Sequence, residues 1–196
     1  MPVYNGEKHI ESAIQSILTQ SIAEIELIII DDGSTDGSVK IINHIVDERV
    51  RLIENVENRG VAYSLNKGLA AVRGKYIARM DSDDIALPLR FEKQINYLEK
   101  HPGLSMCGSW VRAFGEVNTV YKYPEANNEI KVAMLFYPCF AHPSVMWKRK
   151  DFVLNGFKYQ VEPATAEDYD LWIKVAKKLE VANVPEILLE YRVDPQ

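Results

Sequence analysis

The sequence has few of the residues that build covalent or metal cross-links, with only two cysteines, Cys107 and Cys139, among 196 residues. Neither has another Cys or a His at the spacing of a zinc site, so we expect two buried free thiols. No apolar run approaches the roughly 20 residues of a membrane helix, and no signal peptide opens the chain. These absences favour a reducing, cytoplasmic location and exclude a disulfide scaffold.

A net positive charge is also missing, since the formal charge is −5 and the pI is near 5.5. A nucleic-acid binder usually needs a clustered basic face, so the composition argues against nucleic acid as a partner. Internal repeats, low-complexity segments and linkers are absent as well. With 47% hydrophobic residues, the chain is expected to fold as one domain spanning residues 1–196.

Apolar residues follow two alternating periods along the first half of the chain. The run "IELIIIDD", rich in β-branched residues, is typical of a central parallel strand covered on both faces. We expect strands at 1–5, 25–32, 50–55 and 74–81, and helices at 7–20, around 39–45 and at 61–73. This alternation predicts a parallel sheet wrapped by helices, which binds ligands beyond the carboxyl ends of its strands.

The second half alternates less regularly. We expect helices at 88–102, 127–136 and 167–179, strands at 104–114 and 119–124, and extended chain over 181–193 that is broken at Pro185. The predicted class is therefore α/β, with a mostly parallel, Rossmann-like central sheet flanked by helices and a mixed antiparallel portion in the second half.

Polar residues gather where three expected strands end, in "PVYN", "DDGSTD" and "DSDD". In parallel strands these segments would meet at one edge of the sheet. The segment Asp81 to Asp84 places three carboxylates within four positions, and each raises the cost of ionising its neighbours. A divalent cation is the first candidate to offset that repulsion.

Simpler explanations account for single motifs but not for their combination. A calcium loop that began at Asp32 would need Glu at its twelfth position, where Asn43 stands. In a phosphate-accepting receiver domain the acidic pair ends the first strand, whereas here a strand and a helix precede it. A helix N-cap with turn glycines explains "DDGSTDGS" taken alone. Three such segments at one sheet edge make that explanation less favoured.

Together the segments "MPVYNGEKHIESAIQSILTQ", "ELIIIDDGSTDGS", "NRGVAYSLNKGLAAVRGKYIARMDSDD" and "AEDYDLW" resemble the inverting glycosyltransferases of family 2, which have the GT-A fold. The resemblance implies transfer of a sugar from a nucleoside diphosphate, UDP favoured, to an acceptor hydroxyl. It assigns residues 1–100 to nucleotide binding and 101–196 to acceptor binding. Strand one would then be cut at Met1, and both ends would be trimmed.

The same resemblance assigns roles to individual residues. Asp83 and Asp81 match the Asp-x-Asp motif that holds Mn²⁺ or Mg²⁺ near the diphosphate. His142 matches a histidine near the diphosphate, which could donate to that group or ligate the metal. The ribose and base would meet Asp81, Pro2, Val3, Tyr4, Asp32 and Arg59.

Asp168 matches the general base of an "ED" pair, and Glu167 would orient the acceptor. On their own, two acids that open a helix more often complement its dipole. Trp172, one turn further on, is more simply a core residue. Arg59 is equally well explained as a solvated turn residue, and His142 as a structural histidine.

Two other functions stay open. A nucleotide-sugar binding module would bind the donor without turnover, and a sugar nucleotidyltransferase would release pyrophosphate from a nucleoside triphosphate. The acceptor, a glycan or a lipid-linked glycan of a polysaccharide or cell-envelope pathway, follows from analogy alone. Peripheral association with the inner face of the membrane and the oligomeric state are left open.

Overall fold

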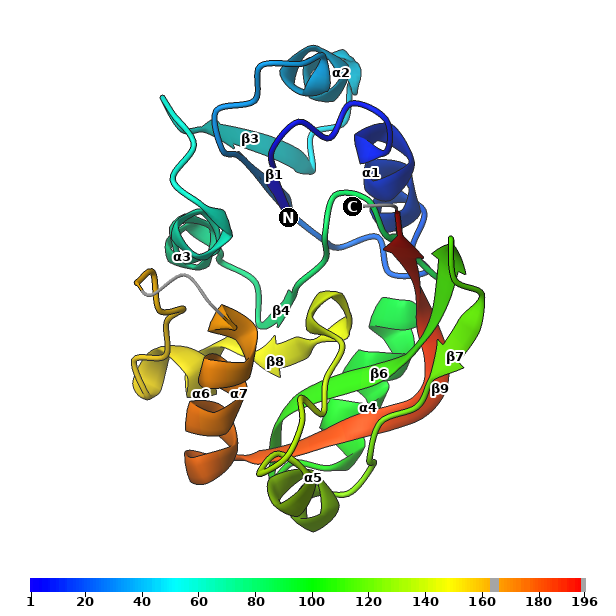
Figure 1. The fold of residues 1–196 in the computed structure, drawn as a ribbon, viewed down its shortest axis with the longest axis vertical. Coiled ribbons are helices and arrows are strands. Elements are labelled where there is room, and N and C mark those ends of the chain that lie inside the picture. Colours follow the sequence, from blue (N-terminus) through cyan, green and yellow to red (C-terminus); the bar gives the residue numbers. More distant parts are fainter. Residues whose placement is uncertain (163–165, 195–196) are drawn as a thin grey trace.

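A computed structural model describes residues 1–162 and 166–194 of the chain, and it contains two separate sheets (Figure 1). The first is parallel, in the order β1 (Pro2–Val3), β2 (Leu27–Asp31) and β3 (Val50–Glu54). All five residues of β2 are buried, as expected for a central strand with helices on both faces.

The helices of the first half form where apolar residues recur every three or four positions. In α1 (Ile10–Leu18), Ile10, Ala13, Ile14 and Ile17 are buried on one face. The second and third helices are α2 (Ser38–His44) and α3 (Val61–Ala71). The sheet carries α1 on one side and α3 on the other (Figure 1), which leaves the carboxyl ends of its strands free for a site.

The second sheet has six strands and is mixed, in the order β4-β8-β6-β9-β5, with β7 paired to β6. Only β6 and β9 run parallel, and their long ladder forms its centre. The strands are β4 (Tyr76–Ala78), β5 (Ile85–Ala86), β6 (Leu104–Gly115), β7 (Thr119–Tyr121), β8 (Met146–Lys148) and β9 (Glu180–Val193).

Helices cover this second sheet around an aromatic core. They are α4 (Arg90–Lys100), α5 (Asn127–Ala133), the 3₁₀ turn η1 (His142–Ser144), α6 (Arg149–Leu154) and α7 (Glu167–Lys178). Trp147 stacks on Phe152 with ring centroids 4.7 Å apart, and Trp172 is fully buried beside them. Trp172 is therefore a core residue, as the simpler explanation held.

The predicted α/β class is confirmed, but two details of the expected sheet are wrong. Residues 74–81 do not continue the parallel sheet: β4 pairs antiparallel with β8, and the Arg79 N–H donates to Val145 O at 3.0 Å. Alternation along the sequence could not show this partner, which lies about 70 residues away. Pro185 does not break β9, because it is exposed at an irregularity in the ladder with β6.

Two further observations concern the cysteines and the helices. Cys107 and Cys139 are both buried free thiols, as predicted. None of the helices that the structure describes is long and apolar enough to cross a membrane.

Candidate active site

A polar pocket of about 310 Å³ opens where strands of both sheets end. It lies beyond β1, beside the loop that follows β4, and at the end of β9. Its lining residues are Tyr4, Asn5, Gly6, His9, Asp81, Ser82, Asp83, Tyr191 and Arg192. The structure thus brings together three residues predicted for donor and metal binding, Tyr4, Asp81 and Asp83, and adds cations that the sequence did not suggest.

Burial and mutual repulsion make the carboxylates of the acidic segment costly to ionise. The buried Arg79 guanidinium pairs with the Asp81 carboxylate. Burial, and then the charge of Asp81, raises the pKa of Asp83, and the same two causes raise the pKa of the buried Asp84 to about 8. One oxygen of Asp84, Oδ2, has no hydrogen-bond partner among the described residues. A positive charge added here would therefore be stabilising.

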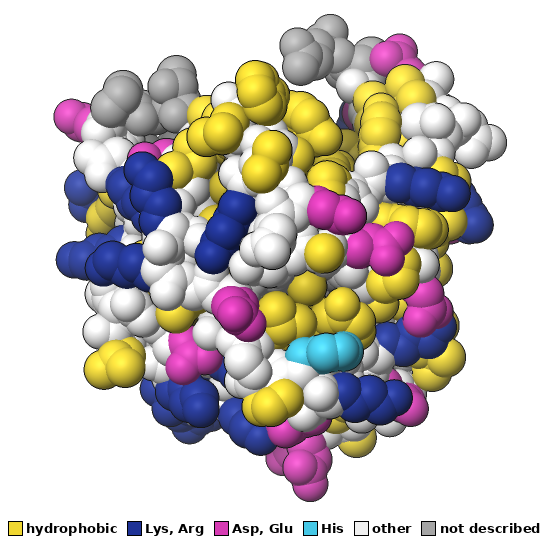
Figure 2. Space-filling model, turned by 90° about the horizontal axis from the view of Figure 1, so that it is seen from below, with side chains coloured by type: hydrophobic (Ala, Val, Ile, Leu, Met, Phe, Trp, Pro, Cys, Tyr) yellow, Lys and Arg dark blue, Asp and Glu magenta, His cyan; other side chains and the backbone are white. Residues whose placement is uncertain are grey.

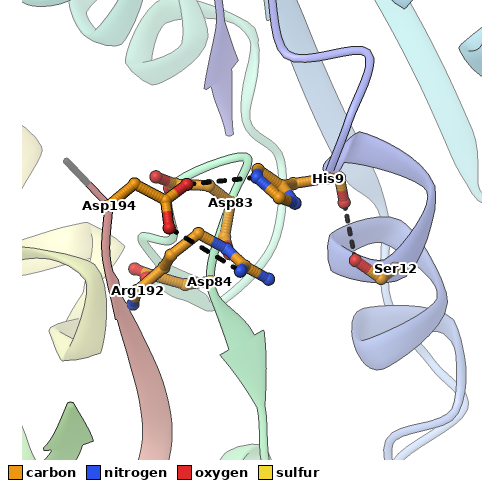
Figure 3. A network of polar contacts seen from close by, with 6 residues as sticks. All are labelled: His9, Ser12, Asp83, Asp84, Arg192 and Asp194. Atoms are coloured by element: carbon orange, nitrogen blue, oxygen red, sulfur yellow. Dashed lines mark hydrogen bonds and ion pairs between the residues drawn. The ribbon is translucent and has the colours of Figure 1, made fainter. Parts of the chain in front are cut away.

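The end of β9 braces the acidic loop through Arg192. Its backbone N–H donates to Asp84 Oδ1 at 2.8 Å, and its Nε donates to the carbonyl oxygen of Asp83 at 3.0 Å. The guanidinium also lies 4.5 Å over the ring of Phe114. Figure 3 shows the Arg192 side chain beside Asp83 and Asp84. Arg192 is thus held in the pocket by contacts that leave its charge next to the carboxylates.

His9 extends the same network from α1. Its Nε2 lies 3.2 Å from Asp194 Oδ2, and Asp194 Oδ1 lies 3.9 Å from the Arg192 guanidinium (Figure 3). Ser12 Oγ donates to the carbonyl oxygen of His9 at 2.7 Å. The pocket wall therefore joins the first helix of the chain to the end of its last strand.

The donor set fits a hard divalent cation. Asp81 and Asp83 line one cavity and offer carboxylate oxygens, which Mg²⁺ and Mn²⁺ prefer. Among the described residues no three His, Cys, Asp or Glu side chains form a metal-binding group. A cation that takes one or two protein carboxylates and completes its shell with phosphates and water needs no third protein ligand.

Asp32 is placed by contacts within the fold rather than by the pocket. Its buried carboxylate accepts from Asn55 Nδ2 at 2.6 Å and from the Gly60 N–H at 2.8 Å, and it also accepts from the Arg59 N–H. These contacts hold the turn that begins α3. By contrast, Asp31 Oδ1 is buried without a hydrogen-bond partner in the part of the chain that the structure describes. Asp32 therefore has a structural role in the fold, in addition to the contact with the base that the sequence predicted.

The other residues predicted for nucleotide binding differ in exposure. Pro2 and Val3 are buried in β1, whereas Tyr4 is 49% exposed at its end. Arg59 is exposed and stacks its guanidinium 4.0 Å over the Tyr63 ring. Tyr4 is the member of this set that lines the pocket with Asp81.

The predicted catalytic pair opens α7. Glu167 and Asp168 lie in the first turn of the helix, after Ala166 in the left-handed conformation with φ of 54°. Asp168 Oδ1 accepts the N–H of Tyr169 at 2.7 Å, and the Tyr169 hydroxyl donates to Met134 O at 2.6 Å. Tyr169 thereby fixes the start of α7 against the end of α5.

The buried Tyr159 is influenced by charges from both predicted centres. Burial is the main cause that raises the pKa of its hydroxyl, and the charges of Asp168, Asp81 and Glu167 add to it. Three carboxylates from the two predicted centres therefore act on one buried side chain.

His142 Nε2 lies 2.9 Å from the Tyr159 hydroxyl, and the two rings are 5.4 Å apart. Burial, and then Arg79, lowers the pKa of His142 well below its usual value. The structure places His142 as a neutral, hydrogen-bonded residue and does not group it with Asp81 and Asp83.

Four contributors to this region were missed in the sequence. Tyr191 and Arg192 lie at the end of β9. Looking for polar residues at strand ends, as was done for the first three segments, would have identified them. His9 begins a helix directly after the first polar segment. Tyr159 lies in a loop with no periodic signal, and nothing in the sequence indicates its place.

The two sheets and the pocket define an α/β protein with a polar site at the ends of its strands, and comparison with known proteins identifies its family. The chain belongs to glycosyl transferase family 2, whose model matches residues 1–158. It is 35% identical over 203 residues to an uncharacterized glycosyltransferase of Haemophilus influenzae, covering 97% of this chain and 63% of the relative. It is 37% identical over 202 residues to the O-antigen biosynthesis glycosyltransferase WbnJ of Escherichia coli, covering 98% and 78%.

Solved structures share the fold at low sequence identity. S. aureus TarS 1–349 in complex with UDP-GlcNAc superposes with a TM-score of 0.86 at 16% identity, covering 100% of this chain and 58% of that one. Mannosyltransferase PcManGT from Pyrobaculum calidifontis, in complex with GDP-Man and Mn²⁺, gives a TM-score of 0.71 at 18% identity, covering 97% and 55%. The chain thus spans little more than half of these structures.

Proposed function

We propose that this chain carries out metal-assisted, inverting transfer of a sugar from a nucleoside-diphosphate sugar to an acceptor hydroxyl. The observation that carries the proposal is the pocket in which Tyr4, Asp83 and Arg192 meet at the ends of three strands from two sheets. Family membership supports the reaction class.

The acidic loop would hold the metal, with Asp83 as the ligand and Asp81 as a second ligand or a partner of its water shell. When bound, the divalent cation stabilises the negative charge that grows on the leaving diphosphate. Arg192, which is hydrogen-bonded to the acidic loop, would supply a fixed positive charge beside the same diphosphate. Arg79 holds Asp81 in place from the protein interior.

Asp168 would act as the general base. A neutral hydroxyl is a poor nucleophile, and inversion requires attack from the face opposite the departing diphosphate. Asp168 lies half-buried in the first turn of a packed helix, where the contact of Tyr169 with Met134 restricts its movement. Glu167 is its neighbour on the acceptor side.

UDP is the favoured nucleotide, but the contacts of Asp32 do not supply the reason. Because Asp32 already accepts three backbone or amide hydrogens, a base N–H would have to share its oxygens. The preference is supported instead by TarS, a neighbour in complex with UDP-GlcNAc. PcManGT, which binds GDP-Man, makes GDP the competing donor.

An exposed apolar patch after α5 supports a polysaccharide or lipid-linked acceptor. Val132, Leu135 and Phe136 lie at the spacing of one helix face, and Leu135 and Phe136 are 76% and 79% exposed. They belong to the end of the molecule that Figure 2 faces, where hydrophobic side chains gather beside Lys and Arg. Such a surface suits peripheral contact with an anionic membrane. Flotation with vesicles containing anionic lipid tests this, because Phe136→Ser should reduce binding.

The donor site is tested by calorimetric titration of UDP with Mn²⁺, and again with EDTA. We expect binding that requires the metal and is lost in Asp83→Ala, because the carboxylate that anchors the cation is gone. Asp170→Asn is the matched control, since Asp170 is an exposed carboxylate paired with Lys174 at 2.5 Å. Unchanged UDP binding by Asp83→Ala would refute the metal assignment.

Turnover is tested with UDP-sugars and Asp168→Asn. This variant should keep UDP affinity and lose at least about 100-fold in turnover, the usual contribution of a positioned base. Asp170→Asn should stay near the unmodified rate. Binding without turnover in every acceptor screen would favour a binding module. Release of pyrophosphate from a nucleoside triphosphate would indicate a nucleotidyltransferase.

A further inference from the structure

One face of the second sheet is open to solvent at the end of β6. Val111 and Ala113 are fully buried there. By contrast, Arg112 is exposed, and Trp110 and Phe114 are partly exposed. Because successive side chains of a strand point to opposite faces, Trp110, Arg112 and Phe114 share the open face. From the first to the last of them the strand runs roughly 13 Å, at about 3.3 Å per residue.

Strand β9 adds two charged side chains to the same face. Both β7 and β9 pair with β6, and the three strands lie together in Figure 1. The register places Glu190 opposite Arg112 and Arg192 opposite Phe114. The paired side chains meet: Arg112 Nη1 lies 3.3 Å from Glu190 Oε1, and the Arg192 guanidinium lies over the Phe114 ring. This face is therefore ordered although it is open.

Trp110 is fixed in orientation, whereas the cation above it is free to move. The Trp110 Nε1 donates to the carbonyl oxygen of Tyr123 at 3.1 Å. Lys122 Nζ lies 4.8 Å over the ring, and Lys122 makes no hydrogen bond or ion pair with the residues that the structure describes. A contact of this kind is weak at an exposed site, so a ligand can displace the lysine. We call six side chains the open strip: Trp110, Arg112, Phe114, Lys122, Glu190 and Arg192.

The open strip is continuous with the polar pocket. Arg192 belongs to both, because it lines the pocket with Asp83 and also covers Phe114. Trp110 lies at the other end of the strip, further from the pocket along β6. A ligand that reaches from the pocket to Trp110 must be longer than one sugar ring. The strip therefore fits an extended ligand.

The polar groups of the strip suit a ligand that both donates and accepts hydrogen bonds. Arg112 and Lys122 can only donate, and the Glu190 carboxylate can only accept. A polyanion would meet Glu190, and a polycation would meet Arg112 and Lys122. Sugar hydroxyls can pair with all three residues, and the C–H groups of a pyranose ring can pack on the negative face of the Trp110 indole. This combination favours an uncharged oligosaccharide.

We propose that the open strip binds the acceptor through an uncharged oligosaccharide chain. The unit that receives the sugar lies in the polar pocket, and a unit further along the chain packs on Trp110. Naming this ligand the acceptor rests on the proposed function, whereas binding of an oligosaccharide to the strip does not. Trp110 is then a specificity-determining residue that selects acceptor length, since it touches a unit remote from the reacting atoms.

Binding to the strip can be measured through Trp110 itself. The chain has three tryptophans, and Trp147 and Trp172 are only 2% and 0% exposed. Quenching of tryptophan fluorescence by acrylamide therefore reports mainly on Trp110. The probes are glucose, mannose, galactose and N-acetylglucosamine, each compared with longer oligosaccharides of the same series, in the absence of donor.

We expect at least one series to protect Trp110 from acrylamide, with affinity that rises at least about tenfold from the monosaccharide to the trisaccharide. The response should disappear in Trp110→Phe, because the two remaining tryptophans are buried. The proposal is wrong if no series protects Trp110, if the monosaccharide binds as tightly as the longer chains, or if Trp110→Phe keeps the response.

Kinetics form the second arm, with the protecting oligosaccharide as acceptor. Trp110→Ala should raise the acceptor KM about tenfold and leave kcat, metal-dependent UDP binding and the KM of the monosaccharide unchanged. Trp110→Phe keeps an aromatic ring and should restore most of the acceptor affinity. Tyr137→Ala, which removes an aromatic side chain that is 50% exposed outside the strip, is the matched control.

A fall in kcat with unchanged KM in Trp110→Ala, or an equal rise in KM in Tyr137→Ala, would overturn the assignment of the strip. Protection of Trp110 without turnover of any donor would support oligosaccharide binding by the strip and count against the proposed transfer alone. The two proposals therefore fail on different measurements.

Discussion

The buried Met1 amine makes the stability of the chain depend on pH in a defined direction. Its pKa falls from a usual value near 8 to about 5 on folding. Between these values the unfolded chain holds a proton that the folded chain lacks, so stability is complete above pH 8 and is lost as the pH falls toward 5. Three pKa units correspond to at most about 4 kcal/mol.

Urea unfolding between pH 8.5 and pH 5 measures this loss, on material whose mass confirms that Met1 is retained. The matched comparison is a variant with Thr-Val-Ile-Val-Ile added ahead of Met1, in which a peptide N–H replaces the ammonium group that donates to Ile28 O. The difference in unfolding free energy between the two proteins should grow by up to about 4 kcal/mol as the pH falls. If both proteins lose stability in parallel, the amine does not titrate as its burial requires, and the inference about this position fails.

Two further substitutions test packing in the second sheet. Gly108→Ala should cost about 1–3 kcal/mol in urea unfolding, because its Cβ would lie 2.3 Å from Asn183 Oδ1; Gly68→Ala, which has room, is the control, and an equal loss from both would contradict the packing argument. Tyr159→Phe should cost about 1–2 kcal/mol by leaving His142 Nε2 without its partner. Tyr159→Phe should keep metal-dependent UDP binding. Loss of that binding would indicate that His142, which Tyr159 positions, contributes to the metal site.

The sequence predicted that Tyr4 and the acidic loop lie together, and they line one pocket. The parallel-strand rule does not explain this meeting, because β4 belongs to the second sheet and pairs antiparallel with β8. Helix positions followed from apolar spacing. The expected helix over 7–20, for example, contains α1 at Ile10–Leu18.

The partners of each strand could not be predicted, because they depend on contacts far apart in sequence. The sequence of the short strand β4 is compatible with either sheet. Its antiparallel pairing with β8 places it in the second sheet. Asp32 illustrates the same limit for a side chain. Its position after β2 was evident, whereas its bonds to the turn at Arg59 and Gly60 depend on how α3 packs.

The two sheets together explain why the acidic loop can be both crowded and ordered. Arg79 lies beneath it and pairs with Asp81, while Arg192 comes from β9 and binds Asp84 and the Asp83 carbonyl. These contacts hold the loop, and the Asp83 carboxylate, whose pKa is raised, lines the pocket. A divalent cation in this cavity would stabilise the ionised form of Asp83 and could also bind the phosphates of a donor. Since Arg192 and Asp83 share one sheet and Tyr4 belongs to the other, donor affinity should depend on how firmly the two sheets are joined.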